Sequence, residues 1–217
     1  MKNRILHMFF PPKCILCKKL LAEEETDLCR SCRENQPEYP SHKFNLSFLA
    51  QCTGLWYYKE NVRNSILRYK FYGRRHYAGA YGRLLAMKLQ KEGWDDTDIL
   101  TWAPISRRRK FRRGYDQVEL FGTALAQELG LSLVPTLRKI RHTKPQSTMG
   151  GAAQRRANIL GAFEVIDPAL IRGKRILLLD DIVTTGATAS ECGRVLLTAG
   201  AKEVKLATLA VASHDKK

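Results

Sequence analysis

The sequence contains no run of about 18 apolar residues, which is the length that a helix needs to cross a bilayer. Its short N-terminal segment Met-Phe-Phe is followed by Pro-Pro-Lys-Cys, not by the small residues of a signal-peptide cleavage site. These two absences argue against membrane insertion and export. We therefore expect a soluble, cytoplasmic protein.

Acidic residues are scarce, with 21 Asp and Glu against 37 Lys and Arg, so the formal net charge is +16. An excess of this size predicts an anionic partner, which can be a nucleic acid, a nucleotide or a membrane surface. Charge alone does not choose among the three. The length of 217 residues allows one medium domain with a small appendage, but not two full domains.

Cysteine is also sparse, but its spacing is informative because four of the six cysteines form two Cys-x-x-Cys pairs. Cys14 pairs with Cys17 and Cys29 with Cys32, and eleven residues separate the two pairs. Such pairs predict one tetrahedral, structural Zn²⁺ bound by four thiolates, with no open coordination position for catalysis. A redox role is the alternative, but it would require one pair within a strand-helix-strand unit. We expect a zinc module and linker over residues 1–53 and a larger domain over residues 54–217.

The larger domain is organised around residues 175–188, which read RILLLDDIVTTGAT. The apolar run Ile176 to Leu179 predicts a strand buried on both faces of a parallel sheet. Asp180 and Asp181 follow at its carboxyl end, and a Thr- and Gly-rich turn leads into a helix expected to reach about Leu197. A helix start favours a phosphate, and adjacent carboxylates can bind ribose hydroxyls or a hydrated Mg²⁺. The alternative is an ordinary strand-turn-helix unit with a capping threonine.

A second strand is expected over residues 98–105, followed by the basic segment SRRRKFRRGYDQ and by a helix from about Asp116 to Leu129. The carboxyl ends of parallel strands meet at one edge of a sheet, so this charge is expected beside Asp180. It favours pyrophosphate or a nucleic-acid backbone over a purely structural role. The expected DNA- or anion-binding residues of this segment are Arg108, Arg109, Lys110, Arg112, Arg113 and Gln117.

Basic and aromatic residues alternate in RYKFYGRRHY, residues 68–77, within a region that otherwise predicts a strand followed by mostly helical structure. Basic residues interleaved with aromatic ones can hold a nucleic-acid backbone and stack its bases. Arg74 and Arg75 are the anion-binding candidates here. The alternative is a solvated basic face whose aromatic rings belong to the core.

The acid pair, two apolar residues and Thr-Thr-Gly-Ala-Thr resemble the phosphoribosyl-diphosphate (PRPP) motif of type I phosphoribosyltransferases. The segment APISRRRKFRRGYDQVELFGTALA resembles the signature of the ComF family, whose members also carry an N-terminal four-cysteine module. Tyr115 and Asp116 stand where the family often has Phe and Asn. The resemblance covers nearly the whole chain. It implies an α/β fold with a type I phosphoribosyltransferase-like central parallel sheet, preceded by the small four-cysteine zinc-binding module.

The resemblance also implies residue roles. The turn Thr184 to Thr188 would hold the 5-phosphate of PRPP, and the two aspartates would hold the ribose hydroxyls. Ser106 and Arg107 would begin the loop that binds pyrophosphate. The PRPP-binding candidates are Asp180, Asp181, Val183, Thr184, Thr185, Gly186, Ala187, Thr188, Ser106, Arg107 and, from a Lys-Phe-Tyr-Gly element, Lys70.

Residues 131–162 begin with an expected edge strand and continue as a Gly-, Ser- and Gln-rich segment that predicts a long mobile loop. In related transferases a loop here closes over PRPP and excludes water. The alternative is a disordered surface loop. The lid residues that the resemblance implies are Gln146, Ser147, Arg155, Arg156 and Asn158.

For function, the resemblance implies Mg²⁺-dependent PRPP binding in a protein that handles single-stranded DNA during natural transformation. A competence helicase or other DNA-processing proteins would be its partners. The alternative is an active phosphoribosyltransferase of nucleotide salvage or related metabolism, for which the sequence shows neither an acceptor site nor an assignable catalytic residue. A third reading is a zinc-tethered subunit of a helicase complex without activity of its own.

Overall fold

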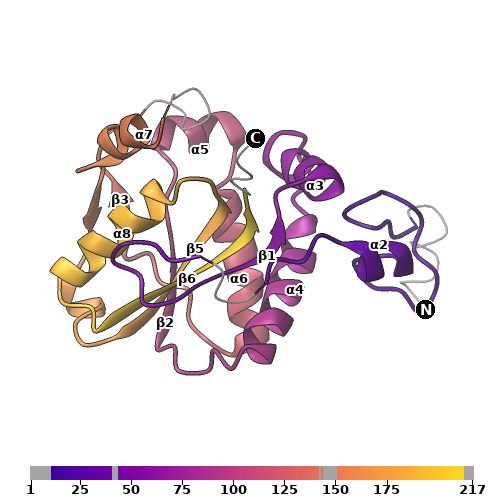
Figure 1. The fold of residues 1–217 in the computed structure, drawn as a ribbon, viewed down its shortest axis with the longest axis horizontal. Helices are drawn as coiled ribbons and strands as arrows, with labels where there is room; N and C mark the ends of the chain where they lie inside the picture. The colour runs from indigo at the N-terminus through magenta and orange to yellow at the C-terminus, as the bar shows by residue number, and fades with distance from the viewer. Residues whose placement is uncertain (1–10, 41–43, 142, 144–150, 213–217) are drawn as a thin grey trace.

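A four-stranded parallel sheet forms the centre of the molecule (Figure 1). The structure is a computed structural model that describes residues 11–40, 44–141, 143 and 151–212. The strand order is β1-β6-β5-β2, and every neighbouring pair is parallel. The strands are β1 (Cys52–Tyr57), β6 (Glu203–Val211), β5 (Arg175–Val183) and β2 (Ile99–Trp102). The expected α/β class with a parallel central sheet is confirmed.

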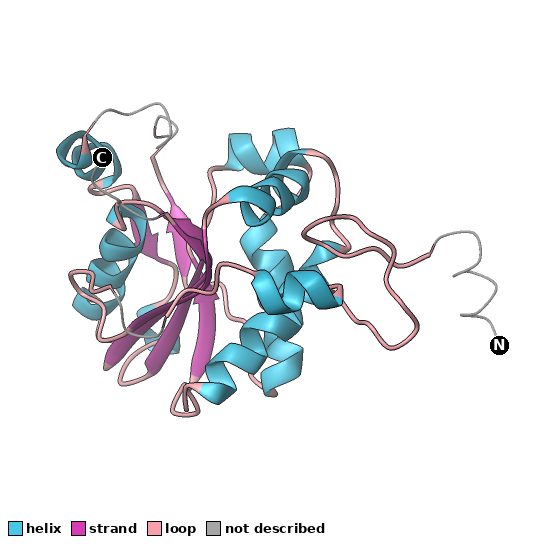
Figure 2. Cartoon of the chain, turned by 45° about the vertical axis from the view of Figure 1, so that its right-hand side comes forward, coloured by secondary structure: helices cyan, strands magenta, loops and turns pink. Residues whose placement is uncertain are grey.

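Helices cover both faces of this sheet (Figures 1 and 2). On one side lie α3 (Glu60–Phe71), α4 (Tyr77–Lys91) and α6 (Gln117–Leu129), and on the other lie α7 (Ala152–Ile159) and α8 (Ala187–Thr198). The helices α4 and α6 cross closely, because a Cβ added to Gly82 would lie 2.6 Å from the Cβ of Ala124. The sheet is therefore the middle of three layers.

The central strand β5 is buried on both faces, as its apolar run predicts. Ile176 and Leu178 belong to the core on the α8 side, whereas Leu177 and Leu179 belong to the core beneath α4 and α6. This alternation follows from the two-residue period of a strand. Asp180 and Asp181 come directly after this apolar run, so they lie near the carboxyl end of β5.

Residues 106–115 do not form the expected loop. Helix α5 (Arg107–Arg113) occupies most of this segment, because Arg and Lys are good helix formers and Gly114 ends the helix in the left-handed region at φ 76°. Asp116 then caps α6 by accepting hydrogen bonds from the backbone N–H groups of Val118 and Glu119.

The expected edge strand over residues 131–140 is divided into two parts. Leu133 forms an isolated parallel bridge with Leu100 of β2 at the edge of the central sheet, and the later part lies outside that sheet. Pro135 interrupts it, since proline cannot donate to a strand ladder. Only β3 (Leu137–Lys139) forms, and it pairs antiparallel with β4 (Phe163–Val165). The region expected as a long loop contains α7, and a short 3-10 helix, η2 (Pro168–Leu170), leads to β5.

The N-terminal module packs against α3 and α4. It contains the short helix α2 (Arg30–Asn35), and its Ile15, Leu16 and Leu28 join the core of the larger domain. Asp27 of the module forms an ion pair with Arg83 of α4 at 2.6 Å. The two parts thus share one hydrophobic core. In the described part of the chain, no helix has the length and apolar character needed to span a membrane.

Candidate functional site

A cleft of about 670 Å³ opens at the carboxyl ends of β2 and β5. The last residues of β5 and the segment that follows them, residues 180–189, line its floor, and α3, α5 and the start of α6 contribute the opposite wall. Residues 139, 143, 155, 159 and 163 close a further side. Segments that are far apart in the sequence therefore come together in this cleft, and they include most of the residues that the sequence analysis predicted to bind PRPP.

The turn before α8 has the form that a phosphate site requires. Gly186 stands at the N-cap position with φ 71°, in the left-handed region that favours glycine. The first-turn amides of α8 have no acceptors within the helix, and Thr184, Thr185 and Thr188 line the cleft beside them. Leu46 supports the turn from behind, because a Cβ added to Gly186 would collide with its Cδ2.

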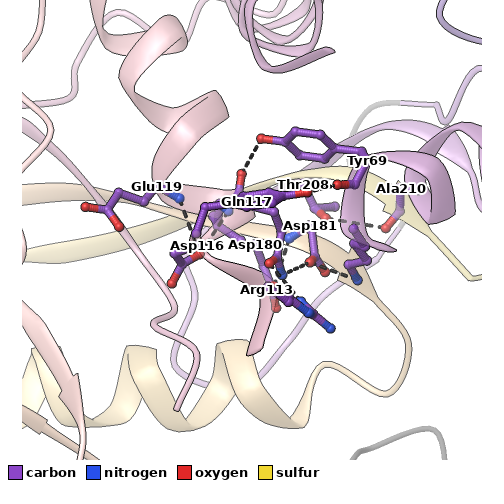
Figure 3. Close-up of polar contacts among 12 residues, drawn as sticks. Tyr69, Arg113, Asp116, Gln117, Glu119, Asp180, Asp181, Thr208 and Ala210 are labelled. Atoms are coloured by element: carbon purple, nitrogen blue, oxygen red, sulfur yellow. Dashed lines mark hydrogen bonds and ion pairs between the residues drawn. The ribbon is translucent and has the colours of Figure 1, made fainter. Parts of the chain in front are cut away.

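The two aspartates differ in their surroundings (Figure 3). Asp181 forms a buried ion pair with Lys70, 2.8 Å from its Nζ, and accepts a hydrogen bond from Gln117 Nε2 at 2.7 Å. Within the described residues, Asp180 accepts only the backbone N–H of Asp181, at 2.8 Å. Arg113 donates to the Oε1 of Gln117 at 2.8 Å, so a chain of polar contacts leads from α5 to the acid pair.

Because their surroundings differ, the two aspartates have different pKa values. Burial, followed by the neighbouring charge of Asp181, raises the pKa of Asp180 to about 8. Burial would raise the pKa of Asp181 as well, but the Lys70 ammonium and the Gln117 amide lower it below its ordinary value. At neutral pH the cleft therefore holds one carboxylate that is already paired and one carboxyl group that is largely protonated.

Positive charge dominates the cleft. Among the described residues, its walls carry two carboxyl groups, those of Asp180 and Asp181, against seven cationic side chains. These cations are Arg63, Lys70, Arg109, Arg112, Arg113, Lys139 and Arg155. Burial, followed by the charges of Arg113 and Arg112, lowers the pKa of Arg109. Such a concentration of like charge is stabilised by an anion.

The structure brings most of the expected PRPP-binding residues to this cleft. Those that line it are Lys70, Asp180, Asp181, Val183, Thr184, Thr185, Gly186, Ala187 and Thr188, joined by Arg109, Arg112, Arg113, Gln117 and Arg155. Ser106 and Arg107 are not among the lining residues. Ser106 is buried at the N-cap of α5, and its Oγ has no hydrogen-bond partner within the described ranges.

Other candidates lie away from the cleft. Arg74, Arg75, Arg107, Arg108, Lys110 and Arg156 are exposed, and Asn158 is half-buried on α7. Lys110 is paired with Glu119 at 2.7 Å. Gln146 and Ser147 fall outside the described residues.

Two cationic residues of the cleft were not singled out from the sequence. Arg63 precedes Lys70 by seven positions on α3, and this helical spacing is a signal that could have found it. Lys139 has no such signal, because only the pairing of β3 with β4 brings it to the cleft. Its Nζ lies 5.0 Å from the ring centroid of Phe163, and burial, followed by the charge of Arg109, lowers its pKa to about 8.

The four N-terminal cysteines form a metal site. Their sulfur atoms all lie within 4.8 Å of one another, and Cys17 Sγ is 3.6 Å from Cys29 Sγ. Four thiolates around Zn²⁺ at about 2.3 Å require sulfur atoms about 3.8 Å apart, so the arrangement fits the ion. The predicted structural zinc site is supported. The two other cysteines, Cys52 and Cys192, are buried in the core.

Two family models match the chain. One, described as a double zinc ribbon domain, matches residues 5–43, and the other, a phosphoribosyl transferase domain, matches residues 119–217. Competence protein F of Haemophilus influenzae is 24% identical over 232 residues, which cover 93% of this chain and 98% of that protein. Competence protein ComFC of Streptococcus pneumoniae is 28% identical over 230 residues, covering 91% and 99%. The chain is thus similar to two ComF-type competence proteins along more than nine tenths of its length.

A third relative extends this picture. DNA utilization protein YhgH of Salmonella typhimurium is 32% identical over 142 residues, which cover 63% of this chain and 61% of that protein. Within this chain, the transferase match includes the acid pair and the turn before α8, whereas Lys70 and α5 lie before its first residue. The zinc-ribbon match includes all four clustered cysteines.

Proposed function

We propose that the cleft binds PRPP. The observation that carries this proposal is the set of seven cationic side chains, against two carboxyl groups, that the described residues bring to the cleft around the turn before α8. The pyrophosphate end would bind three cations, because Arg109, Arg112 and Arg113 of α5 line the cleft. The 5-phosphate would lie on the amides and hydroxyls of residues 184–188. The ribose hydroxyls would bind the acid pair.

Mg²⁺ would enter with the diphosphate, because Asp181 is already engaged by Lys70 and Gln117. Asp180 has the freer carboxyl oxygens, and hydrated Mg²⁺ is commonly held through one or two carboxylates and the substrate's phosphates. Binding of Mg²⁺-PRPP would then ionise Asp180. The bound ion would neutralise part of the charge of the diphosphate, and the side chains of the cleft would hold PRPP in position.

Calorimetric titration of the zinc-loaded protein with Mg²⁺-PRPP tests this proposal. We expect saturable binding that weakens at least tenfold in Asp180→Asn. Asp98→Asn is a matched control, because Asp98 sits at the opposite end of β5, where it accepts a hydrogen bond from Arg175 N. Equal affinity of all three proteins, or no binding by the wild type, would refute a PRPP site in this cleft.

We also propose that this protein acts in DNA uptake, on single-stranded DNA in the cytoplasm together with DNA-processing proteins. Support comes from the names of its relatives, two competence proteins and a DNA utilization protein, and from the net charge of +16. Expression in Haemophilus influenzae that lacks its Competence protein F should restore transformation frequency. A chain that is expressed and zinc-loaded but restores nothing would contradict this role.

Transfer of the phosphoribosyl group is the second candidate function. It is favoured by the raised pKa of Asp180, because a carboxyl group that exchanges its proton near neutral pH suits acid-base catalysis. In such a transfer the C1–oxygen bond to pyrophosphate breaks, an acceptor nitrogen bonds to C1, and the acceptor loses a proton. Release of pyrophosphate with a nucleobase acceptor, lost in Asp180→Asn, would establish it; no release with any base tested would leave binding alone.

A further inference from the structure

Three large aromatic side chains are exposed beside the cleft. Phe111 on α5 is 93% exposed, Tyr72 at the end of α3 is 73% exposed, and Phe71 is 55% exposed. By contrast, Tyr69 and Tyr77 of the same basic-aromatic stretch are buried. The stretch is thus divided: part of it builds the core, and part of it faces solvent. Scattered exposed aromatics need no explanation, but a group on one surface does.

The end of α3 and helix α5 form one continuous surface. The guanidinium of Arg113 lies 4.8 Å from the ring centroid of Phe71, and that of Arg75 lies 4.6 Å from the ring centroid of Tyr115. A Cβ on Gly114 would approach Arg75 Nη2 to 2.9 Å. In Figure 1 both helices lie in the upper part of the view, with α5 to the left of α3.

This surface carries no compensating acid of its own. Residues 68–77 and 104–115 contain no Asp or Glu. Two neighbouring basic side chains do have acidic partners from other elements: Lys110 of α5 is paired with Glu119 of α6, and Arg83 of α4 with Asp27. Exposed arginines on the surface, including Arg74 and Arg108, are therefore available to an external polyanion.

We propose that this basic-aromatic surface binds single-stranded DNA at the mouth of the cleft. We define it by Phe71, Tyr72, Arg74, Arg108 and Phe111. The arginines would hold phosphates, and the exposed rings of Tyr72 and Phe111 would stack unpaired bases. A duplex offers phosphates but no free base faces, so the aromatic rings select a single strand. This inference rests on the proposed role in DNA uptake, and it names the surface that performs it.

Fluorescence anisotropy of a labelled oligothymidylate, titrated with the full zinc-loaded chain, tests the inference. The wild type should bind at low salt and weaken as salt rises, because counterions are released from the phosphates. The double variant Tyr72→Ala, Phe111→Ala should bind at least tenfold more weakly, since a stacked base contributes about 1–3 kcal/mol. Its affinity for Mg²⁺-PRPP should be unchanged, because neither side chain lines the cleft.

Two variants with the same change of charge distinguish binding at this surface from the general electrostatic attraction of DNA to a basic protein. Arg108→Glu should weaken binding of the single strand strongly, whereas Lys174→Glu, an equal change at an exposed position just before β5, should have little effect. Equal losses in both variants, undiminished binding by the aromatic double variant, or equally tight binding of a blunt duplex would each overturn the inference. No binding by the wild type at low salt, with intact PRPP binding, would refute the proposed DNA role itself.

Discussion

Asp180 and Asp181 are adjacent in the sequence but perform different tasks in the folded protein. Asp181 is fixed by Lys70 and Gln117, so it organises the wall formed by α3 and α6. Asp180 faces the cleft and keeps its proton at neutral pH. The composition of the motif predicts an acid pair beside a phosphate, but only the structure shows which acid is available to a ligand.

The raised pKa of Asp180 predicts that the free protein loses stability as pH rises from about 4 to about 8. In this range the folded protein holds a proton on Asp180 that the unfolded chain has released, so raising the pH favours unfolding. Asp180→Asn should remove this dependence and melt about 2–4 °C above the wild type at pH 8.5. Thermal melts across a pH series, with Asp98→Asn as control, measure the effect; parallel curves for wild type and Asp180→Asn would contradict it.

The lowered pKa of Lys139 leads us to expect that the protein takes up protons when an anionic ligand binds. With a pKa of about 8, its amine is partly neutral at pH 8 in the free protein, and an anion in the cleft would raise that pKa. Affinity for PRPP should therefore fall as pH rises above about 8. Titrations in buffers of different ionisation enthalpy should show fewer protons taken up by Lys139→Met than by the wild type at pH 8. Identical uptake by both proteins would exclude Lys139 from the anion site.

At the scale of elements, local sequence patterns predicted the strand and the helix start that form the floor of the cleft. They did not predict all the elements that form its walls. The apolar run Ile176 to Leu179 predicts β5, and the turn at Gly186 predicts the start of α8. Both predictions succeed because they depend only on neighbouring residues in the sequence. Helix α5 was missed although its signals are local: Arg and Lys are good helix formers, Gly114 ends the helix, and Asp116 caps α6. The prediction of a loop rested only on the charge of this segment. Lys139 was missed because its position depends on a long-range pairing of β3 with β4.

The turn before α8 predicts the effect of substituting Gly186. Gly186→Ala should destabilise the protein by about 1–2 kcal/mol from backbone strain in the left-handed region, and further because the new Cβ collides with Leu46. Leu46→Ala should make room for that Cβ. In denaturant titrations the double variant should therefore lose less stability than the two single losses added together. Strict additivity would show that Leu46 does not confine the turn.

At the scale of the whole molecule, the zinc module is joined to the cleft through α3. The carbonyl of Ile15, between the first two cysteines, accepts hydrogen bonds from Ser65 Oγ at 2.5 Å and from Arg68 Nη2 at 2.9 Å. Arg68 Nη2 also donates to the carbonyl of Leu16 at 2.7 Å. Two residues beyond Arg68, the same helix presents Lys70 to Asp181. Cysteine spacing predicts the zinc site, but it says nothing of this connection.

Loss of zinc should therefore weaken PRPP binding although the metal does not touch the cleft. Without four ligated thiolates the turn that carries Ile15 and Leu16 loses its shape, α3 loses three hydrogen bonds, and Lys70 is held less firmly. We expect Cys14→Ser to lose zinc and to bind Mg²⁺-PRPP about tenfold more weakly, which corresponds to about 1.4 kcal/mol.

Arg68→Ala distinguishes this connection from general unfolding. It leaves all four cysteines in place, so metal analysis should find one zinc per chain, yet two of the three hydrogen bonds to the module are gone. Calorimetry should then show an intermediate loss of PRPP affinity in a folded, zinc-loaded protein. Undiminished affinity in both Cys14→Ser and Arg68→Ala would mean that the module and the cleft are independent, and that the shared core positions α3 without help from the metal.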